Sequence, residues 1–216
     1  MTDDYDFEGL PLVSLRPGTS VLVVGPSHAG TRHLAFRMLS GPPDEGAILV
    51  STNQRAGRIA DDWARSGFEL DEERAAILDC VGDEDQSVRA QVLPVSGPSD
   101  LTGIGMRYSD VDRTFRESGV ERVRTGLFSV STLLSFGDLK PVSRFVHTLV
   151  GRIDAIDGIG VFCIDPGMHD EQTVSTITQF CSARIDVRET ESGQELRARG
   201  VPDQPREWVS FDVETE

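Results

Sequence analysis

The sequence predicts an α/β fold with a mostly parallel central sheet, helices on both faces and an antiparallel hairpin near the C-terminus. Three observations predict it. Short apolar runs alternate with amphipathic segments of helical period along most of the chain. The first of these runs, Ser20 to Val24, is almost continuously apolar, as is typical of a strand buried on both faces of a parallel sheet. Towards the end of the chain, two β-type runs flank a turn at Ser192 and Gly193.

The elements follow one another in regular order. Apolar runs predict five strands, at 20–24, 47–51, 75–79, 124–130 and 160–164. Helical spacing predicts helices at 30–39, at 109–117, at 139–156 and at 170–181, and another that starts from a cap at Thr52 or Asn53 and ends at Gly67. The hairpin takes residues 183–190 and 194–199, and a further strand takes 207–213.

Two segments stand apart from this pattern. Residues 1–17 are acidic and contain proline, and we expect a partly mobile segment there, followed by a single domain over 18–216. Residues 82–100 are polar and rich in turn residues, and 101–106 form a short apolar insertion. We expect a surface loop over 82–106, of a length that suits contact with a partner.

The charge balance excludes some functions. Among 216 residues, 36 are acidic and 21 basic, which gives a net charge of −15 and makes nucleic-acid binding an unlikely role. Lys140 is the only lysine, and this replacement of lysine by arginine beside abundant carboxylates is typical of proteins from salt-loving archaea. No signal peptide and no membrane-spanning run is expected, so the predicted location is cytoplasmic. The three cysteines, Cys80, Cys163 and Cys181, lack metal-ligand spacing, and we expect them to be buried as apolar residues.

A glycine-flanked loop follows the first strand and is the candidate binding site. Its outline is that of a phosphate-binding loop, G-x-x-x-x-G-K-[ST], but Thr31 stands at the lysine position and Arg32 at the hydroxyl position. One residue along a helix turns a side chain by roughly 100°, so we expect Arg32 to point away from where that lysine would reach. Anion binding by free N–H groups at the helix N-terminus remains open. The candidate cofactor-binding residues are Gly25, Pro26, Ser27, His28, Ala29, Gly30, Thr31 and Arg32.

Other polar residues are expected beside this loop, because the carboxyl ends of parallel strands share one edge of the sheet. That edge takes residues 25–31, 51–54 and 129–132, together with Asp165. The hydroxyls of Ser129, Ser131 and Thr132 suit either phosphate contacts or the capping of a turn, and we favour capping. Asp165 suits either magnesium binding through water, with Asp170 or Glu171 as a base, or an Asp-Pro-Gly turn. His28 and His169 suit an anion or metal contact, although histidines in surface loops are usually inert.

With these motifs in order, the chain resembles the KaiC/RecA-type ATPase domain, and it is most similar to the small single-domain KaiC-like proteins of salt-loving archaea. The resemblance covers about residues 8–213. Five segments carry it: Gly25–Arg32, Leu49–Gln54, Leu127–Leu134, Val161–Glu171 and Glu195–Gly200. It implies the P-loop NTPase form of the α/β fold, with ATP and Mg²⁺ bound at the loop.

The chain departs from that family at the positions that carry the chemistry. The resemblance implies a pair of carboxylates where this chain has Asn53 and Gln54, and a magnesium-supporting Asp where it has Phe128. An amide does not accept a proton as a general base does. Phosphoryl transfer depends on the lysine, the metal and the group that orients water. We therefore expect a degenerate domain that does not hydrolyse ATP and has no catalytic residue, metal or cofactor.

The functional hypothesis is a regulatory or signalling module that binds a protein partner, either a second copy or an active KaiC-like relative. The alternative is an atypical ATPase that binds ATP and Mg²⁺ through Arg32 and Asp165 in a re-registered site. A third hypothesis, an accessory protein of DNA recombination, follows from fold analogy alone.

Overall fold

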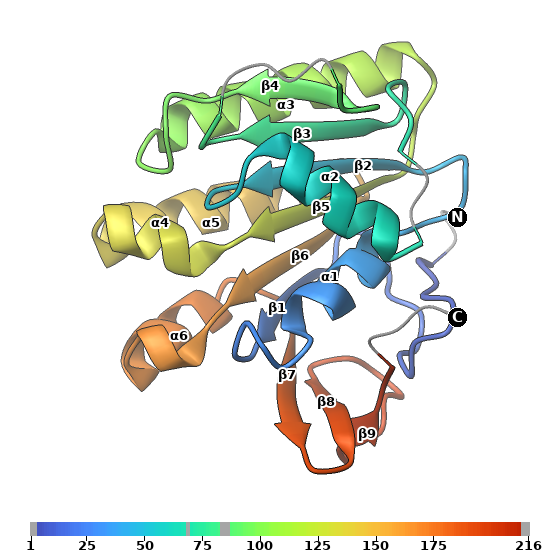
Figure 1. The fold of residues 1–216 in the computed structure, drawn as a ribbon, viewed down its shortest axis with the longest axis vertical. Helices are drawn as coiled ribbons and strands as arrows, with labels where there is room; N and C mark the ends of the chain where they lie inside the picture. The colour runs from blue at the N-terminus through green and yellow to red at the C-terminus, as the bar shows by residue number, and fades with distance from the viewer. Residues whose placement is uncertain (1–3, 68–69, 83–86, 213–216) are drawn as a thin grey trace.

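The computed structural model describes residues 4–67, 70–82 and 87–212, and it confirms the predicted fold class (Figure 1). Within the described residues, nine strands form one sheet in the order β4-β3-β2-β5-β6-β1-β7-β8-β9. Pairing is parallel from β4 to β7 and antiparallel from β7 to β9. The strands are β1 Ser20–Val24, β2 Gly46–Ser51, β3 Ala75–Asp79, β4 Gln91–Pro94, β5 Val123–Phe128, β6 Ile159–Ile164, β7 Ala183–Thr190, β8 Gly193–Arg199 and β9 Val209–Ser210.

The helices cover both faces of this sheet. They are α1 Thr31–Leu39, α2 Ala56–Arg65, α3 Leu101–Glu117, α4 Val130–Phe136, α5 Leu139–Ala155 and α6 Glu171–Thr178, with a short 3₁₀ turn, η1 Pro166–Met168. In Figure 1, α1 and α2 lie in front of the sheet, and α3 and α5 lie behind it.

Two apolar cores result, because successive side chains of a strand point to opposite faces. Val21 and Val23 of β1 pack into the core shared with α1 and α2. Leu22 and Val24 of the same strand pack into the core shared with α3, α4, α5 and α6. The continuously apolar strands of the sequence are therefore buried on both faces, as predicted.

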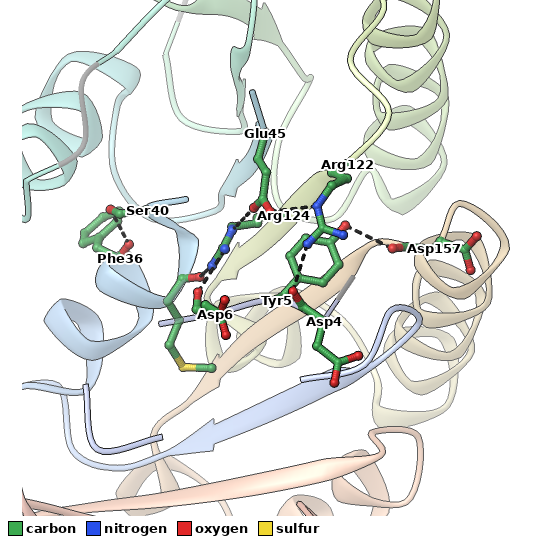
Figure 2. A network of polar contacts seen from close by, with 10 residues as sticks. Asp4, Tyr5, Asp6, Phe36, Ser40, Glu45, Arg122, Arg124 and Asp157 are labelled. Atoms are coloured by element: carbon green, nitrogen blue, oxygen red, sulfur yellow. Dashed lines mark hydrogen bonds and ion pairs between the residues drawn. The ribbon is translucent and has the colours of Figure 1, made fainter. Parts of the chain in front are cut away.

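The N-terminal residues from Asp4 onward lie against the domain. Tyr5 pairs with Leu15 in an antiparallel bridge, and the side chains of Tyr5, Phe7, Leu10 and Leu15 belong to the core shared with α1 and α2. The Tyr5 hydroxyl donates a hydrogen bond to the carbonyl of Asp157 at 3.0 Å (Figure 2).

Two arginines, Arg124 of β5 and Arg122 just before that strand, hold this segment in place (Figure 2). The buried Arg124 guanidinium pairs with the Glu45 carboxylate and donates to the carbonyls of Met38 and Asp6. The guanidinium of Arg122 lies 3.9 Å from the centre of the Tyr5 ring and also pairs with Glu45. The buried Glu45 carboxylate thus pairs with both Arg122 and Arg124, and both arginines also contact the N-terminal residues.

The segment predicted as a surface loop over 82–106 contains a strand at 91–94 and the start of a helix at 101–106, so the prediction was wrong for those residues. Gln91–Pro94 form β4 at the edge of the sheet, and α3 begins at Leu101. The Asp100 carboxylate caps α3 by accepting a hydrogen bond from the Gly103 N–H at 2.8 Å. Residues 83–86 of the predicted loop lie outside the described residues.

Four further details differ from the predictions. The strand predicted over 124–130 ends at Phe128, because Ser129 caps a helix, α4, that was not predicted. Neither Thr52 nor Asn53 caps α2. Its first N–H, that of Ala56, is instead bound at 2.7 Å by the carboxylate of Asp79, at the end of β3. The predicted helix over 170–181 ends at Thr178, and the final strand spans only two residues of the predicted 207–213, of which Val213 lies outside the described residues.

No helix in the described ranges is both long enough and apolar enough to cross a membrane.

Candidate functional site

The loop between β1 and α1 has the backbone shape that its two glycines predict. Gly30 takes a left-handed conformation, with φ of 79°, that other residues rarely adopt. Gly25 is enclosed: a Cβ there would lie 2.5 Å from the Thr31 hydroxyl and 2.9 Å from the side chain of Val187. Both glycines are thus required by the geometry of the turn, whatever the loop binds.

Thr31, at the position of the family's lysine, closes the loop on itself. Its hydroxyl donates to the carbonyl of Pro26 at 2.9 Å, and the N–H of Ala29 donates to the same carbonyl at 3.0 Å. The Thr31 side chain is buried, whereas a phosphate-binding lysine extends from the loop towards its ligand.

Asp165 lies directly against the loop. It follows β6, and β6 is the neighbour of β1 in the sheet, with Val24 opposite Ile164. One carboxylate oxygen accepts from the N–H and the hydroxyl of Ser27, at 3.3 and 3.4 Å, and the other accepts from the Gly167 N–H at 2.9 Å. A fixed negative charge therefore lies where the N–H groups of a phosphate-binding loop would meet a phosphate.

Arg32 turns towards α2 and two aromatic rings. Its guanidinium carbon lies 5.7 Å from the ring centres of both Phe36 and Phe128, and its Nε lies 3.8 Å from the carboxylate of Asp62. Burial lowers the pKa of Arg32, and Asp62 acts in the opposite direction. The side chain is 27% exposed and also lines the cavity described next.

A cavity of about 180 Å³ lies at the carboxyl ends of the strands. As predicted, it brings together the loop, the end of β2, the start of α4 and Asp165. Ligand pockets in proteins usually enclose about 300–1,000 Å³, so this one is small for a nucleotide. Its lining includes Gly25, Ser27, Thr31, Arg32, Asn53, Phe128, Ser129, Ser131, Thr132, Cys163 and Asp165.

The hydroxyls at this cavity are engaged in local structure. Ser129 caps α4 and accepts from the Thr132 N–H at 3.3 Å, which confirms the capping interpretation for Ser129. The Ser131 hydroxyl accepts from the N–H of Asp165 at 2.9 Å. Ser131 and Ser27 therefore hold Asp165 from two sides.

The residue at the magnesium-supporting position is built into the core. Phe128 is buried, and its ring stacks on that of Phe36 with centres 4.7 Å apart. In the ranges that the structure describes, no group of three or more His, Cys, Asp and Glu side chains is arranged to hold a metal ion. Phe128 in the core, Thr31 hydrogen-bonded to Pro26 and the Asp165 carboxylate against Ser27 do not fit the Mg-ATP that the resemblance implies.

The two predicted histidines and Asp170 do not line this cavity. His28 lines a second cavity, between α1 and α2, together with Ser27, Gly30 and Arg32 of the same loop, whereas His169 lies between η1 and α6. Asp170 caps α6 by accepting from the Thr173 N–H, and hydrogen bonding by the Thr173 side chain and then by that N–H lowers the pKa of Asp170. Burial raises the pKa of the Cys80, Cys163 and Cys181 thiols to about 12, so none of them is a thiolate nucleophile near neutral pH.

One residue of this region escaped the sequence analysis. Asp79 is buried, and its carboxylate accepts from the N–H groups of Ala56, Val81 and Gly82. Its place at the end of a predicted strand was the only signal in the sequence. It organises the turn that carries Asn53 towards the cavity.

Comparison with known proteins places this geometry among KaiC-like folds. The fold is similar to that of the KaiC-like protein PH0186 from Pyrococcus horikoshii OT3, with a TM-score of 0.64 and 15% identity over 91% of this chain and 84% of that one. It is also similar to PH0321 from Pyrococcus horikoshii, an uncharacterized protein solved in complex with an unknown peptide. There the TM-score is 0.69 and the identity 14%, over 92% of this chain and 90% of that one.

At such low identity, these likenesses establish the fold alone. No curated protein matches the chain in sequence. A protein family does match residues 18–187, which is most of the chain and includes the loop, Phe128 and Asp165. The chain therefore belongs to DUF7504, a family of unknown function.

Proposed function

We propose that this chain is a KaiC-like domain that does not hydrolyse nucleotide and acts by binding a protein partner. The observation that carries the proposal is the contact between Asp165 and Ser27, at 3.3 Å from the N–H and 3.4 Å from the hydroxyl. A phosphate group at this loop would have to displace a carboxylate that carries the same sign of charge. Two unit charges 4 Å apart repel by about 4 kcal/mol near a protein surface, and this chain has no lysine at the loop to offset that repulsion.

The other positions support the same conclusion. The Thr31 hydroxyl is already hydrogen-bonded to the Pro26 carbonyl. Phe128, stacked on Phe36, stands where the resemblance implies a magnesium-supporting carboxylate. Enzymes catalyse phosphoryl transfer almost entirely by positioning the reactants and stabilising the transition-state charge. Without the lysine, the metal-supporting Asp and the water-orienting carboxylates, this chain lacks the groups that do so.

The fold itself is compatible with a binding role. The described residues form a nine-stranded sheet with an apolar core on each face, so the domain offers a folded surface to a partner. The neighbour PH0321, which shares the fold, was solved in complex with a peptide. The partners that we propose are another protein, a second copy of the chain or an active KaiC-like relative, and the role is regulatory.

A second function is favoured by one observation. Arg32 and Asp165 line the same cavity with Ser129 and Thr132, so a cation, a carboxylate and two hydroxyls converge at the strand ends. An atypical ATP-binding site would use these groups, with Mg²⁺ on Asp165. It requires Asp165 to leave Ser27 and Arg32 to leave Asp62.

Binding of a fluorescent ATP analogue and ATP hydrolysis discriminate the two functions. We expect no binding and no hydrolysis by the wild-type chain. The atypical-site alternative instead predicts binding that is lost in Arg32→Ala and in Asp165→Ala. A triple variant, Thr31→Lys, Arg32→Thr and Asp165→Asn, restores the lysine and the hydroxyl and removes the opposing charge. Nucleotide binding by this variant and not by the wild type shows that those three side chains keep nucleotide out.

A further inference from the structure

The outer face of α5 carries three basic residues in a stretch of the chain without acidic residues. Lys140, Arg144 and Arg152 are exposed on this helix, and at about 100° per residue Arg144 lies between the other two around the helix axis, about 40° from Lys140 and about 80° from Arg152. We call these three residues the basic ridge. No acidic residue occurs from Lys140 to Arg152, in a chain with a net charge of −15.

The basic ridge is not neutralised by neighbouring carboxylates. On the adjacent α3, Arg113 pairs with Asp110 and Arg116 pairs with Asp112. By contrast, in the described part of the chain no ion pair involves any residue of the ridge. Arg152 donates hydrogen bonds to the Gly105 carbonyl and the Ser109 hydroxyl of α3, which hold its side chain against that helix.

An apolar groove lies on each side of the ridge. The groove between α3 and α5 has a volume of about 360 Å³, and Met106, Phe145 and Leu149 line it together with Arg144 and Arg152. Met106 is 64% exposed, which is unusual for a large apolar side chain at a groove. The groove between α5 and α6 has a volume of about 550 Å³, and it is lined by Leu139 and Phe180 beside Lys140 and Arg144.

We propose that the basic ridge and its two grooves dock an acidic amphipathic helix of another protein. This inference rests on the proposed function, because it names the surface and the partner chemistry of the binding module. An amphipathic helix laid along a groove between two helices places apolar residues into it at intervals of three and four. Aspartate or glutamate on the flanks of that helix meets Arg144 and Lys140.

The dimensions fit a short helical segment. Lys140 and Arg152 are twelve residues apart on α5, a rise of about 18 Å, so about three turns of a partner helix span the ridge. The net charge of the chain repels an acidic partner at long range. Salt at about 0.15 M screens charges beyond about 8 Å, while contacts at ion-pair distance persist.

Two other occupants fit less well. A nucleic acid gains affinity by the neutralisation of many phosphates and gains nothing from apolar grooves, and the ridge offers three cations on an acidic protein. A second copy docked through the same face would, by two-fold symmetry, oppose one basic ridge to another.

The test uses the full chain and a fluorescein-labelled helical peptide of about 16 residues, with leucine at helical spacing and glutamate elsewhere. Fluorescence anisotropy at about 0.15 M salt measures its affinity. A scrambled peptide of the same composition, a peptide with lysine in place of glutamate, and oligo-dT serve as competitors. The protein variants are Lys140→Glu with Arg144→Glu, Met106→Ser, and the control Arg206→Glu, which reverses an exposed arginine away from α5.

We expect the acidic amphipathic peptide to bind and the three competitors not to displace it. We also expect binding to weaken at least about tenfold in the double charge reversal, to weaken in Met106→Ser, and to be unchanged in Arg206→Glu. Equal binding by wild type and the double variant overturns the proposal, as does no binding at all. Tighter binding of oligo-dT, or self-association of the wild type that the double variant abolishes, overturns it in favour of a nucleic acid or a second copy. Nucleotide binding is measured separately, so failure here is distinguishable from failure of the proposed function.

Discussion

The carboxylate of Asp165 holds Ser27 by both its backbone N–H and its hydroxyl, and so ties the end of β6 to the loop that follows β1. A second contact supports the first, because the Ser131 hydroxyl accepts from the N–H of Asp165. The groups that a phosphate-binding loop offers to its ligand are thus partly satisfied within the protein. The loop therefore has a structural role, because it connects β1 to the end of β6 through these hydrogen bonds.

Replacing Asp165 tests that role. Asp165→Ala removes the acceptor of three hydrogen bonds, and we expect it to lower the free energy of unfolding by about 1–2 kcal/mol. Amide hydrogen exchange at Ser27 should become faster, because its N–H loses its partner. Asp165→Asn keeps an oxygen acceptor and should be affected less. Unchanged exchange at Ser27 in the alanine variant would show that the contact does not hold the loop.

The close packing around Gly25 predicts a loss of stability in Gly25→Ala. The added Cβ would meet the Thr31 hydroxyl and Val187 at under 3.0 Å, so we expect a loss of about 1–3 kcal/mol in urea unfolding. Gly151 in α5 is the matched control. A Cβ there meets nothing within 4 Å, and Gly151→Ala should be neutral or stabilise the helix by up to about 1 kcal/mol. Equal effects of the two changes would contradict this account of the loop.

The buried carboxylate of Glu45 predicts a larger effect. Glu45→Gln removes the charge that balances Arg122 and Arg124, and Arg124 is only 1% exposed. Breaking a buried ion pair from one side typically lowers stability by about 3–5 kcal/mol. Asp110→Asn breaks an exposed pair with Arg113 and should lie within about 1 kcal/mol of wild type. Chemical unfolding of both variants compares them, and a small effect of Glu45→Gln would mean that the network is dispensable.

His33 predicts a pH dependence. Burial, and to a smaller extent Arg37, lowers its pKa in the folded chain. The unfolded chain therefore binds more protons than the folded chain below about pH 6.5, and stability falls as the pH falls through that window. Carboxylates with lowered pKa, such as Asp71 and Asp170, act only at more acidic pH. The fall in stability between about pH 7 and pH 5.5 should be smaller in His33→Gln than in wild type, and an identical fall would exclude His33 as its source.

Periodicity predicted most strands of the sheet but missed β4, and it misled where glycine interrupts the helical pattern of α3. Gly103 and Gly105 in the apolar run after Asp100 suggested an insertion, but they lie inside α3, where Ile104 and Tyr108 pack into the core. Packing outweighed the low helix propensity of glycine. Because Val130 is apolar, the strand was predicted to continue to residue 130. Ser129, a residue type that favours helix N-caps, instead caps α4.

The candidate site, too, was predicted only in part. The convergence of the loop, residues 51–54, residues 129–132 and Asp165 at one edge followed from parallel strands alone. The partnership of Asp165 with Ser27 did not, because it depends on β6 lying next to β1, and the sequence alone does not give the order of the strands in the sheet. The capping of α2 by Asp79, at the end of β3, could not be predicted either, because a capping residue 23 positions away in sequence leaves no local pattern.

Thermal unfolding of the purified chain with and without millimolar Mg-ATP tests the central claim most directly. A ligand that binds only the folded state stabilises it by about 2.7 kcal/mol at 100 times its dissociation constant. For a domain of this size, that corresponds to an increase in melting temperature of roughly 5–11 °C. We predict a cooperative transition whose midpoint Mg-ATP leaves unchanged. A clear upward shift, abolished by Arg32→Ala or Asp165→Ala, would contradict the account and identify the cavity at the strand ends as a nucleotide site.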